Sequence, residues 1–371
     1  MKKLLIITHV IHGKNQKYFG YAPYVREMNI WTKYVQEVLV IAPLQAAAKS
    51  TIDLEYYHQN LAFKKIESIN FQTFGTTFKS LLKLPKIFNI IFREMKSADH
   101  IHLRCPGNIG LLGCIVQIFF PSKQKSAKYA GNWDPKSKQP LSYKVQKWIL
   151  SNTYLTRNMT VLVYGDWPNQ SRNIKPFFTA SYFEVDKVEI ETKLLHNEIK
   201  FLFVGSLTLG KRPLYAVKIV GELQKRGKNV CLDIYGEGQQ RNILEQYIAT
   251  HQIPQIKLHG NQEENTIRNA YKNAHLLILP YESEAWPKVV AEAMFWKCLP
   301  IVSSVSCVPY MLDFGRRGVL LQLQVDIDVA EILKIMDNDD SYNVIVTGGM
   351  LWSQKFTLDL FEEEVKKVLK V

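Results

Sequence analysis

The sequence predicts an α/β protein made of two Rossmann-like, doubly wound domains, each built on a parallel β-sheet. Two observations predict this fold class. A chain of 371 residues with 47% hydrophobic content is long enough for two globular domains of ordinary size. Apolar strands alternate with helical segments, an order that favours parallel sheets. We expect domains at 1–190 and 191–355, and a helix within 356–371 that can cross back to the first domain.

The first domain is predicted to begin with a strand at 3–10, a helix at 24–35 and a second strand at 37–42. The segment 78–95 interleaves Leu, Ile and Phe with Lys and Arg, and Pro85 is expected to break it. A basic amphipathic segment of this kind can lie on an anionic membrane surface, and it can equally be a core helix with a basic outer face.

Three more strands are predicted in the first domain, at 98–104, 127–134 and 161–165, with a helix at 109–120. In α/β sheets, ligands bind outside the carboxyl ends of the strands. The polar residues predicted at these ends are Arg104, Asn108, Asn132 and Asp134, and the loop after the first strand adds His12 and Gly13. These positions are therefore candidates for ligand contacts.

The second domain repeats the strand–helix unit regularly. Strands are predicted at 201–205, 230–235, 256–259, 275–280, 300–304 and 319–323. Helices are predicted at 213–226, 239–251, 263–273 and 287–297, and Gly227 supplies a carboxyl-terminal stop for the first of them. This order is typical of a doubly wound domain.

The stretch 279–300 holds the strongest candidate site. A polar loop follows a strand, and Pro287 is expected at the first helical position, where its fixed φ fits and its missing N–H is not needed. The backbone N–H groups of Lys288, Val289 and Val290 would then be free and would point back into the loop. A helix amino terminus of this kind attracts anions, above all phosphate.

Two carboxylates flank that helix terminus. Glu284 precedes the helix, and Glu292 lies inside it, eight positions further on. Carboxylates accept hydrogen bonds from hydroxyl groups, which a sugar or a ribose offers in pairs. The alternative interpretation is that Glu284 caps the helix and that Glu292 is solvated.

Lys211 and Arg212 directly precede the helix predicted at Pro213. A cation beside a helix amino terminus is unfavourable because of the helix dipole, unless an anion comes between them. Both residues are therefore candidates for binding a phosphate group, and the alternative is that they are solvated surface cations.

The segment SEAWPKVVAEAM, followed by LPIVSS, resembles the nucleotide-sugar motif of retaining glycosyltransferases of family 4, which have the GT-B fold. Two glutamates at this spacing, an Ala-Met helix and a Pro-led strand carry the resemblance. Ala285 stands where the family has Gly, and FWKC lacks the family's Gly and runs one residue longer. The resemblance covers about residues 200–325 and includes the YGEG turn at 235–238 and the loop at His259.

The resemblance implies which residues contact a nucleotide-sugar. Lys211 matches the family's lysine that faces the donor diphosphate, whereas Ser206 stands where the family has an arginine that Arg212 could replace. Glu292 would hold the ribose hydroxyls, and Glu284 would orient the transferred sugar. The full set of implied donor-binding residues is Gly205, Ser206, Lys211, Arg212, Gly236, His259, Gly260, Glu284, Ala285, Trp286, Pro287, Lys288, Val289 and Glu292.

The catalytic residues implied by the resemblance are Lys211, Glu284 and Asp134. Asp134 stands where many members carry a histidine near the transferred sugar, and capping of the next helix is its alternative role. The implied acceptor-binding residues are His12, Gly13, Arg104, Asn108 and Asn132. The mechanism favoured for the family is attack on the same face as the departing diphosphate, which requires no protein nucleophile, and we assign none.

The positive charge is concentrated in the first half of the chain. Residues 1–200 hold 28 Lys and Arg against 14 Asp and Glu, whereas residues 201–371 hold 19 against 20. This asymmetry indicates an anionic partner, such as nucleic acid, an anionic lipid or a phosphate-bearing acceptor. No motif that reads nucleic acid is recognisable, so we do not expect nucleic acid as the partner.

No apolar run reaches the roughly 18 residues that span a bilayer, and the first residues are interpreted as a strand rather than a signal peptide. The five cysteines lack CxxC or metal-site spacing, which fits reduced thiols in a cytosolic protein. We therefore expect a cytoplasmic protein that can associate with the inner face of the plasma membrane. No metal or other cofactor is expected, because we identify no Asp-x-Asp metal motif.

The predicted function is transfer of a hexose from a UDP- or GDP-linked donor, with retention of configuration, in a cleft between the two GT-B domains. The acceptor would be a glycan or a polyprenyl-diphosphate-linked molecule, and the basic first domain favours assembly of bacterial surface polysaccharide or lipopolysaccharide. Two alternatives stay open. One is a GT-B enzyme similar to UDP-sugar 2-epimerases, which uses no acceptor. The other is a catalytically degenerate protein that only binds a sugar nucleotide.

Overall fold

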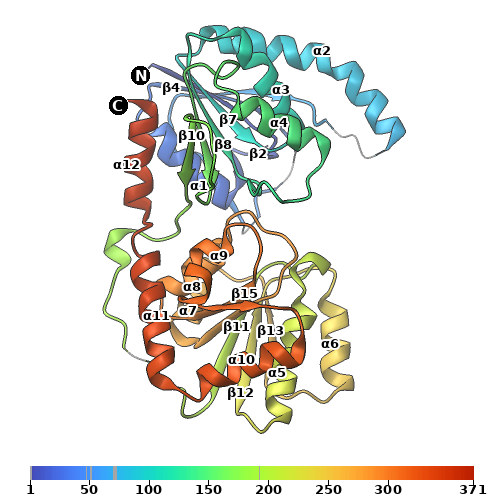
Figure 1. Ribbon diagram of the computed structural model, residues 1–371. Coiled ribbons are helices and arrows are strands. Elements are labelled where there is room, and N and C mark those ends of the chain that lie inside the picture. Colours follow the sequence, from blue (N-terminus) through green and yellow to red (C-terminus); the bar gives the residue numbers. More distant parts are fainter. Residues whose placement is uncertain (1, 47, 51, 70–72, 192) are drawn as a thin grey trace. The chain divides into compact units, whose positions relative to one another are not determined.

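The chain forms two compact units. The computed structural model describes residues 2–46, 48–50, 52–69, 73–191 and 193–371. Unit 1 runs up to Phe178 and resumes at Phe361, whereas unit 2 comprises Thr179–Leu360. Each unit contains a β-sheet flanked by helices (Figure 1). The predicted α/β class with parallel sheets is confirmed, and unit 1 is discontinuous in sequence.

The main sheet of unit 1 is parallel, with strand order β10-β9-β8-β7-β1-β4-β6. Its strands are β1 Lys3–Ile7, β4 Glu37–Pro43, β6 Leu61–Ile66, β7 His100–Cys105, β8 Gln124–Tyr129, β9 Met159–Tyr164 and β10 Ile174–Phe177. A small antiparallel sheet consists of β2 His12–Lys14, β3 Tyr18–Tyr21 and β5 Asp53–Glu55. The small sheet and the edge strands β6 and β10 were not predicted, because these strands are short and carry polar residues.

The helices of unit 1 are α1 Ala22–Thr32, α2 Phe74–Ser97, α3 Asn108–Val116, α4 Leu141–Ser151 and, from Phe361 on, α12 Leu358–Leu369. The prediction that Pro85 breaks its segment is wrong, because α2 continues through this residue. A helix tolerates an internal proline when other contacts offset the lost hydrogen bond. Here Ile87, Ile91 and Met95 are buried against the core and hold the helix in place. None of the described helices is long and apolar enough to cross a membrane.

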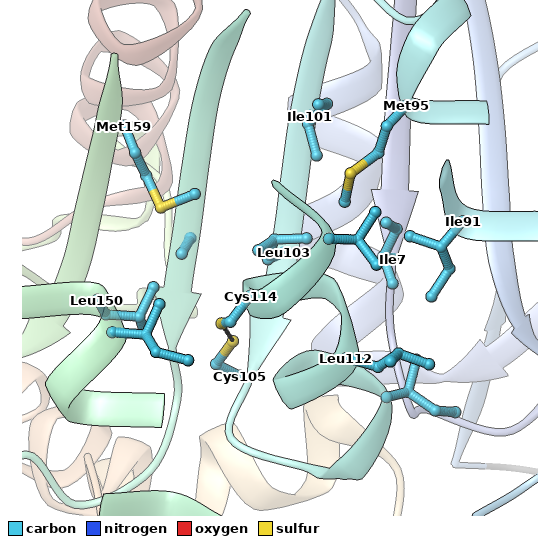
Figure 2. Packing of buried hydrophobic residues seen from close by; sticks show 14 of the residues in the cluster. Ile7, Ile91, Met95, Ile101, Leu103, Cys105, Leu112, Cys114, Leu150 and Met159 are labelled. Carbon is cyan, nitrogen blue, oxygen red and sulfur yellow. Dashed lines mark hydrogen bonds between the residues drawn. The ribbon is translucent and has the colours of Figure 1, made fainter. Parts of the chain in front are cut away.

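One face of the main sheet of unit 1 is apolar and carries the core. Figure 2 shows Ile101 and Leu103 of β7 between the buried side chains of α2 and those of α3. Fully burying one such aliphatic side chain stabilises the fold by about 1.5–3 kcal/mol. Cys105 and Cys114 meet in this core with their sulfur atoms 3.7 Å apart, as free thiols rather than a disulfide.

The other face of the same sheet is polar but also buried. Glu27 of α1 accepts hydrogen bonds from Lys128 (2.9 Å) and Arg104 (3.3 Å), which lie on neighbouring strands. Next to them, His100 and His102 share the hydroxyl group of Ser126, at 2.8 and 2.9 Å. Helix α12 covers part of this face. These polar contacts explain why the strands of unit 1 lack a continuous apolar pattern in the sequence.

Unit 2 has a parallel sheet with strand order β13-β12-β11-β14-β15-β16. The strands are β11 Ile199–Val204, β12 Val230–Tyr235, β13 Ile256–Gly260, β14 Leu276–Leu279, β15 Leu299–Ser303 and β16 Val319–Leu321. The helices are α5 Pro213–Lys225, α6 Arg241–Thr250, α7 Glu264–Asn273, α8 Lys288–Phe295, α9 Val308–Met311, α10 Val325–Met336 and α11 Asp339–Ser353. Each strand and helix predicted in the second domain is present, and its ends lie within three residues of the predicted ends.

Candidate functional site

The candidate site in unit 2 lies where four neighbouring strands end. The turns after β12 and β13 carry glycines with positive φ, Gly236 at +140° and Gly260 at +71°. The N–H of Gly236 donates to the C=O of Gly260 (2.8 Å), and the N–H of Glu282, after β14, donates to Gly210, after β11 (2.9 Å). These bonds join the turns into one polar surface at the carboxyl edge of the sheet.

Gly236 marks the point where two of these turns touch. A Cβ atom at this position would lie 1.9 Å from the carbonyl oxygen of Gly205, on the neighbouring turn. At Gly238, a Cβ atom would lie 2.4 Å from the carbonyl oxygen of Leu207. The two glycines of the YGEG segment are therefore needed for close approach of the backbone. The predicted donor-binding residues Gly205, Gly236 and Gly260 shape the surface through their backbone.

Lys211 and Glu284 come from two different turns and form a direct ion pair. The Lys211 ammonium also lies over the ring of the buried Tyr281, 5.2 Å from the ring centre. Each of the two charged side chains keeps 27% of its surface exposed, so a ligand can reach both. The structure thus brings together the lysine and the first glutamate that the sequence assigned to the diphosphate and the sugar.

Arg212 has a different partner from Lys211. It has φ of +50° at the start of α5, and its guanidinium donates to Glu282 from two nitrogens, at 2.9 and 3.2 Å. Ser206, which stands where the family has an arginine, is exposed. In this ligand-free state Lys211, and not Arg212, is the cation paired with Glu284.

Helix α8 begins one residue later than predicted. Pro287 is its N-cap with ψ of 91°, and Lys288 is the first helical residue. The N–H of Val290 is not free, because it donates to the carbonyl oxygen of Pro287 (3.0 Å). The backbone donors that this helix terminus offers to an anion are therefore those of Lys288 and Val289.

Glu292 is held by two hydroxyl groups inside unit 2. Its Oε1 accepts from Ser181 (2.5 Å) and its Oε2 accepts from Tyr271 (2.9 Å). Burial, and then the charge of Glu292, raise the pKa of Tyr271, so this phenol stays protonated and donates. Glu292 was predicted to accept hydrogen bonds from the paired hydroxyls of a ribose. In this ligand-free state it accepts hydrogen bonds from the hydroxyls of Ser181 and Tyr271 instead.

Two predicted donor contacts, Ala285 and Trp286, have contacts within unit 2 that hold the loop before α8. Trp286 is 6% exposed and packs against Trp352 and Phe356, with ring centres 6.3 and 6.2 Å apart. The carbonyl oxygen of Ala285 accepts hydrogen bonds from Cys307 (3.1 Å) and Ser306 (3.2 Å). Both residues therefore fix the loop before α8, Trp286 through its buried ring and Ala285 through its carbonyl group.

His259 lies at the end of β13 as predicted, but its ring is already engaged. It stacks on Tyr235 with ring centres 4.5 Å apart, and its Nε2 is 2.6 Å from a carboxylate oxygen of Asp233. The arrangement holds the backbone of His259 and Gly260 beside the turn at Gly236. A role for this loop in contacting a nucleotide base stays a prediction.

The sequence contains two Asp-x-Asp pairs after all, Asp326 and Asp328 in the first turn of α10 and Asp337 and Asp339 at the junction of α10 and α11, which corrects the expectation that no such motif is present. The buried Asp328 accepts from the N–H groups of Gln322 (2.8 Å) and Leu323 (3.0 Å) and from the Tyr215 hydroxyl (2.6 Å). These bonds tie the preceding loop to α10, so Asp328 has a structural role. Asp337 accepts from Lys228 (2.6 Å) and Asp339 from the N–H of Leu195 (3.1 Å), which are also contacts within the protein.

Unit 1 has a cavity of about 260 Å³ at the carboxyl ends of β1, β4 and β7. Its lining includes His9, Asn108 and Tyr143. Asn108 was predicted as a ligand contact, and its amide also donates to the carbonyl oxygen of Ile69 (3.1 Å). Burial, and then the charge of Arg104, lower the pKa of His9, which favours its neutral form. A neutral imidazole beside an amide suits an uncharged polar group such as a sugar hydroxyl.

Three other candidates from the first domain are structural in this state. His12 is 1% exposed and uses both ring nitrogens, bonding Val10 and Tyr56 at 2.8 and 2.9 Å. Gly13 is in β2, where the ring of Phe19 occupies the space of a side chain. Arg104 pairs with Glu27 in the buried polar layer. The imidazole lining the cavity is therefore that of His9, three residues before the predicted His12.

Asn132 and Asp134 lie in a loop, because β8 ends at Tyr129, five residues before the predicted end. Asn132 Oδ1 accepts from the N–H of Asp134 (2.9 Å), and Asp134 Oδ1 accepts from the N–H of Lys136 (2.8 Å). These bonds form a compact turn, and they do not match the alternative role given for Asp134, because the N-cap of the next helix, α4, is Pro140. The catalytic role of Asp134 stays a prediction.

Five residues at these two sites were not predicted: His9, Tyr143, Ser181, Tyr271 and Tyr281. His9 had a detectable signal, since it lies two residues after the end of β1 and precedes the loop that was considered, but the first strand was predicted to extend through it to residue 10. The hydroxyl partners of Glu292 had none, because Ser181 lies 111 positions away in the sequence.

The fold and the carboxyl-edge site define a protein with the GT-B fold. Anabaena HepE, solved in complex with UDP, covers all of this chain with a TM-score of 0.73 at 14% identity, and all of HepE is matched. Sucrose-phosphate synthase from Thermosynechococcus elongatus has a TM-score of 0.68 at 14% identity, with 100% of this chain and 98% of that one covered. At such identities the likeness concerns the fold, and the predicted GT-B architecture is confirmed.

Residues 186–350, almost all of unit 2, match the family model of glycosyl transferases group 1. The match lies within unit 2, and the resemblance read from the motif at 279–300 is confirmed. Among curated proteins, Protein CapJ of Staphylococcus aureus is 22% identical over 244 residues. This match covers 62% of the chain and 61% of CapJ, so the chain spans about three fifths of the length of that relative.

Proposed function

We propose that this protein is a retaining hexosyltransferase that uses a nucleotide-sugar donor. The observation that carries the proposal is the partly exposed Lys211–Glu284 pair beside the amino terminus of α8, within the segment that matches the glycosyltransferase family. The relative HepE has been solved with UDP and with UDP-glucose, which supports a UDP-linked donor here. GDP is the second candidate nucleotide.

The donor diphosphate would lie between Lys211 and the backbone N–H groups of Lys288 and Val289 at the start of α8. Negative charge grows on the leaving diphosphate as the sugar–oxygen bond breaks. A fixed cation and fixed backbone donors stabilise that charge, and one such donor is typically worth about 10²–10³ in rate. Glu292 would accept from the ribose hydroxyls, and Glu284 from the hydroxyls of the transferred sugar.

Retention follows if the acceptor oxygen attacks the face from which the diphosphate departs. The bond from the anomeric carbon to the diphosphate oxygen breaks, and a bond to the acceptor oxygen forms. The acceptor proton passes to an oxygen of the leaving diphosphate. This scheme needs no protein nucleophile, and the charge of Lys211 allows it to proceed without a divalent metal.

The acceptor would bind in unit 1, in the cavity lined by His9, Asn108 and Tyr143. We propose a glycan or a polyprenyl-diphosphate-linked acceptor of bacterial surface polysaccharide or lipopolysaccharide assembly, because residues 1–200 carry the excess of positive charge. The first half of α2 supports membrane contact. It exposes Phe78, Leu81 and Leu82, at 59%, 51% and 68%, on the same segment as several lysines.

The test of the donor site is a thermal-shift panel of UDP, GDP, ADP and CMP, with and without magnesium. Saturation at a hundredfold excess over Kd stabilises the folded state by about 2.7 kcal/mol. One nucleotide should raise the melting temperature without magnesium. Product analysis with the matching nucleotide-sugar then separates transfer from epimerisation, because only transfer consumes an acceptor. No shift with any nucleotide would contradict the proposal.

Membrane contact has its own test. Charge reversal at Lys79, Lys83 and Lys86 should abolish flotation of the protein with anionic vesicles, because these cations lie beside the exposed apolar side chains of α2. Nucleotide binding should be unaffected in the same variant. Unchanged flotation would remove the membrane surface from the proposal and leave the donor chemistry intact.

A further inference from the structure

A second pocket of unit 1 lies at the amino ends of β8, β9 and β10, the edge of the sheet opposite the cavity at His9. Its volume is about 710 Å³, within the range of small-molecule sites. The first residues of these strands, the segment 153–158 and the end of α12 form its walls. We call it the amino-edge pocket. Neither the donor residues nor the acceptor cavity contribute to it.

The charge of the amino-edge pocket has one sign. Among the described residues, its lining has no Asp or Glu, and its basic members are Lys125, Arg157, Arg172, Lys175, Lys367 and Lys370. Neutral side chains that can donate hydrogen bonds complete the polar lining, including Thr153, Thr156 and Asn173. A cluster of this kind, drawn from four separate stretches of the chain, is specific to the folded state.

Two of the six basic side chains have partners within the protein. Lys367 pairs with Glu364 at 2.5 Å. The ammonium group of Lys125 donates to the carbonyl oxygens of Phe120 (2.8 Å) and Gln117 (3.3 Å). These two cations are therefore partly compensated by groups outside the pocket.

The other four basic side chains, Arg157, Arg172, Lys175 and Lys370, form no ion pair within the described part of the chain. The guanidinium of Arg157 stacks over the ring of Tyr154, 4.6 Å from its centre, which limits the positions that it can take. Like charges gathered without a counter-charge repel one another and destabilise the fold. An anion in the amino-edge pocket would remove that repulsion.

We propose that the amino-edge pocket binds a phosphate-bearing anion, at a site separate from the donor and acceptor positions. Two arginines favour phosphate, because a guanidinium presents paired N–H groups that match two phosphate oxygens. Lys175 and Lys370 add point charges, so that a diphosphate fits the charge better than a monovalent anion. This assignment goes beyond glycosyl transfer and does not depend on it.

The position of the pocket predicts what its occupant does. Arg157, Arg172 and Lys175 lie at the starts of β9 and β10, whereas Lys367 and Lys370 lie at the end of α12. These parts are separated by almost 200 residues of sequence, and the intervening chain includes unit 2. A bound anion would bridge them and hold the end of α12 on unit 1.

The first experiment measures pyrophosphate binding by calorimetry at fixed ionic strength, in the Lys211→Ala background, so that the donor site does not contribute. We expect one binding event that is at least about tenfold weaker when three arginine and lysine charges of the pocket are removed. The pocket variant is Arg157→Gln, Arg172→Gln and Lys175→Gln. The matched control removes three exposed charges of unit 1 elsewhere, with Lys17→Gln, Arg93→Gln and Lys96→Gln.

The second experiment separates a soluble ligand from a lipid headgroup. Vesicles of phosphatidylglycerol, with phosphatidylcholine vesicles as reference, are tested by flotation against the pocket variant and the control variant. Loss of pyrophosphate binding in the pocket variant alone assigns a soluble diphosphate, and loss of flotation in it alone assigns an anionic phospholipid. Equal behaviour of the two variants in both assays would overturn the proposal.

If the pocket variant fails to fold, hydrogen exchange of the unsubstituted protein tests the proposal without it. Pyrophosphate should slow the exchange of the backbone amides near the end of α12, in the full chain at constant ionic strength. An unchanged exchange rate for these amides, together with no calorimetric binding and no flotation of the unsubstituted protein with phosphatidylglycerol vesicles, would also overturn the proposal.

Discussion

The ammonium group of Lys211 and the carboxylate of Glu284 pair directly, although they come from turns after two different strands. Each group thus neutralises the other while no donor is bound. A diphosphate competes with Glu284 for the ammonium, and the hydroxyls of the sugar compete with Lys211 for the carboxylate. Donor binding therefore replaces the ion pair with two contacts, one between Lys211 and the diphosphate and one between Glu284 and the sugar hydroxyls.

Replacement of Lys211 by Ala should lower kcat by about 10²-fold or more, because the leaving diphosphate loses its fixed cation. Lys225→Ala is the matched control, since that exposed lysine lies on the far end of α5 and should leave the rate unchanged. Steady-state kinetics with the identified donor measures both. Equal rates in the two variants would exclude Lys211 from the chemistry.

Replacement of Glu284 by Gln should affect binding and catalysis in opposite directions. The variant frees Lys211 for the diphosphate, and an exposed ion pair is worth about 0.2–1 kcal/mol, so nucleotide affinity should rise by up to about fivefold. At the same time kcat should fall, because the transferred sugar loses its charged acceptor. Calorimetry with UDP and a rate assay together test this. A fall in both quantities would contradict the competition between Lys211 and the diphosphate.

Replacement of Glu292 by Ala should weaken nucleotide binding by about tenfold, because hydrogen bonds to a charged group contribute about 1.5–3 kcal/mol. The matched variant is Tyr271→Phe, which keeps the carboxylate and removes one internal hydroxyl from it. That change should lower the free energy of unfolding of unit 2 by about 1 kcal/mol and leave nucleotide affinity intact or higher. If the Tyr271→Phe variant bound the nucleotide more weakly than the Glu292→Ala variant, the contact between Glu292 and the ribose would be refuted.

Replacement of Gly236 by Ala should prevent unit 2 from folding stably. The new methyl group would meet the Gly205 carbonyl oxygen at 1.9 Å, and φ at this residue is +140°. The cost should exceed about 3 kcal/mol, since backbone strain adds to the clash. Gly348→Ala, in the middle of α11 with no atom within 4 Å of its new Cβ, should stabilise by about 0.5–1 kcal/mol. Thermal melting of the two variants tests the contrast.

The buried histidines of unit 1 predict acid sensitivity. Burial lowers the pKa of His12 and of His100 to about 4, and it lowers that of His102 well below 6.5. Between pH 6.5 and 4 the unfolded chain binds more protons than the folded chain, so the free energy of unfolding falls as the pH falls. In that window, each histidine lowers the free energy of unfolding by up to about 1.4 kcal/mol for each unit that the pH falls. Above pH 6.5 it causes no further change in this free energy.

The measurement is the melting temperature of unit 1 between pH 4 and 8, for the natural chain and for a variant with His100→Gln and His102→Gln. Removing two of the three groups should flatten the fall in melting temperature on the acid side. The variant starts less stable at pH 8, because Ser126 loses its partners, so the slope and not the absolute temperature is compared. An equal slope in both proteins would mean that other groups carry the acid sensitivity.

The regular half of the chain was predictable because local patterns and tertiary structure agree there. In unit 2, apolar strands and amphipathic helices alternate, and Pro213 and Gly227 match the start and the end of α5 as predicted. Unit 1 was harder to predict, because Glu27, Lys128 and His102 are buried next to polar partners. A hydrophobicity pattern predicts that residues of these types are exposed. Burial of a polar residue depends on a partner elsewhere in the chain, which local sequence does not reveal.

The same limit applies to the site. Lys211, Glu284 and Glu292 were found because they belong to a motif with fixed spacing. Which loop residues turn inward was not predictable, and so Trp286 and His12, both of types common in ligand sites, proved to be core residues. The internal partners of Glu292 also had no local signal, although they decide what that carboxylate contacts while no ligand is bound.

The discontinuity of unit 1 has a consequence for biosynthesis. Phe361 packs against Phe177 and Phe178, with ring centres 5.3 and 6.0 Å apart, and Val365 and Leu369 are buried beside them. A ribosome delivers these three residues only after all of Thr179–Leu360 has emerged. Unit 2, although it is made later than the sheet of unit 1, can therefore reach its native state first. Until then, the nascent polypeptide exposes an unfinished apolar surface at Phe177 that a chaperone can recognise.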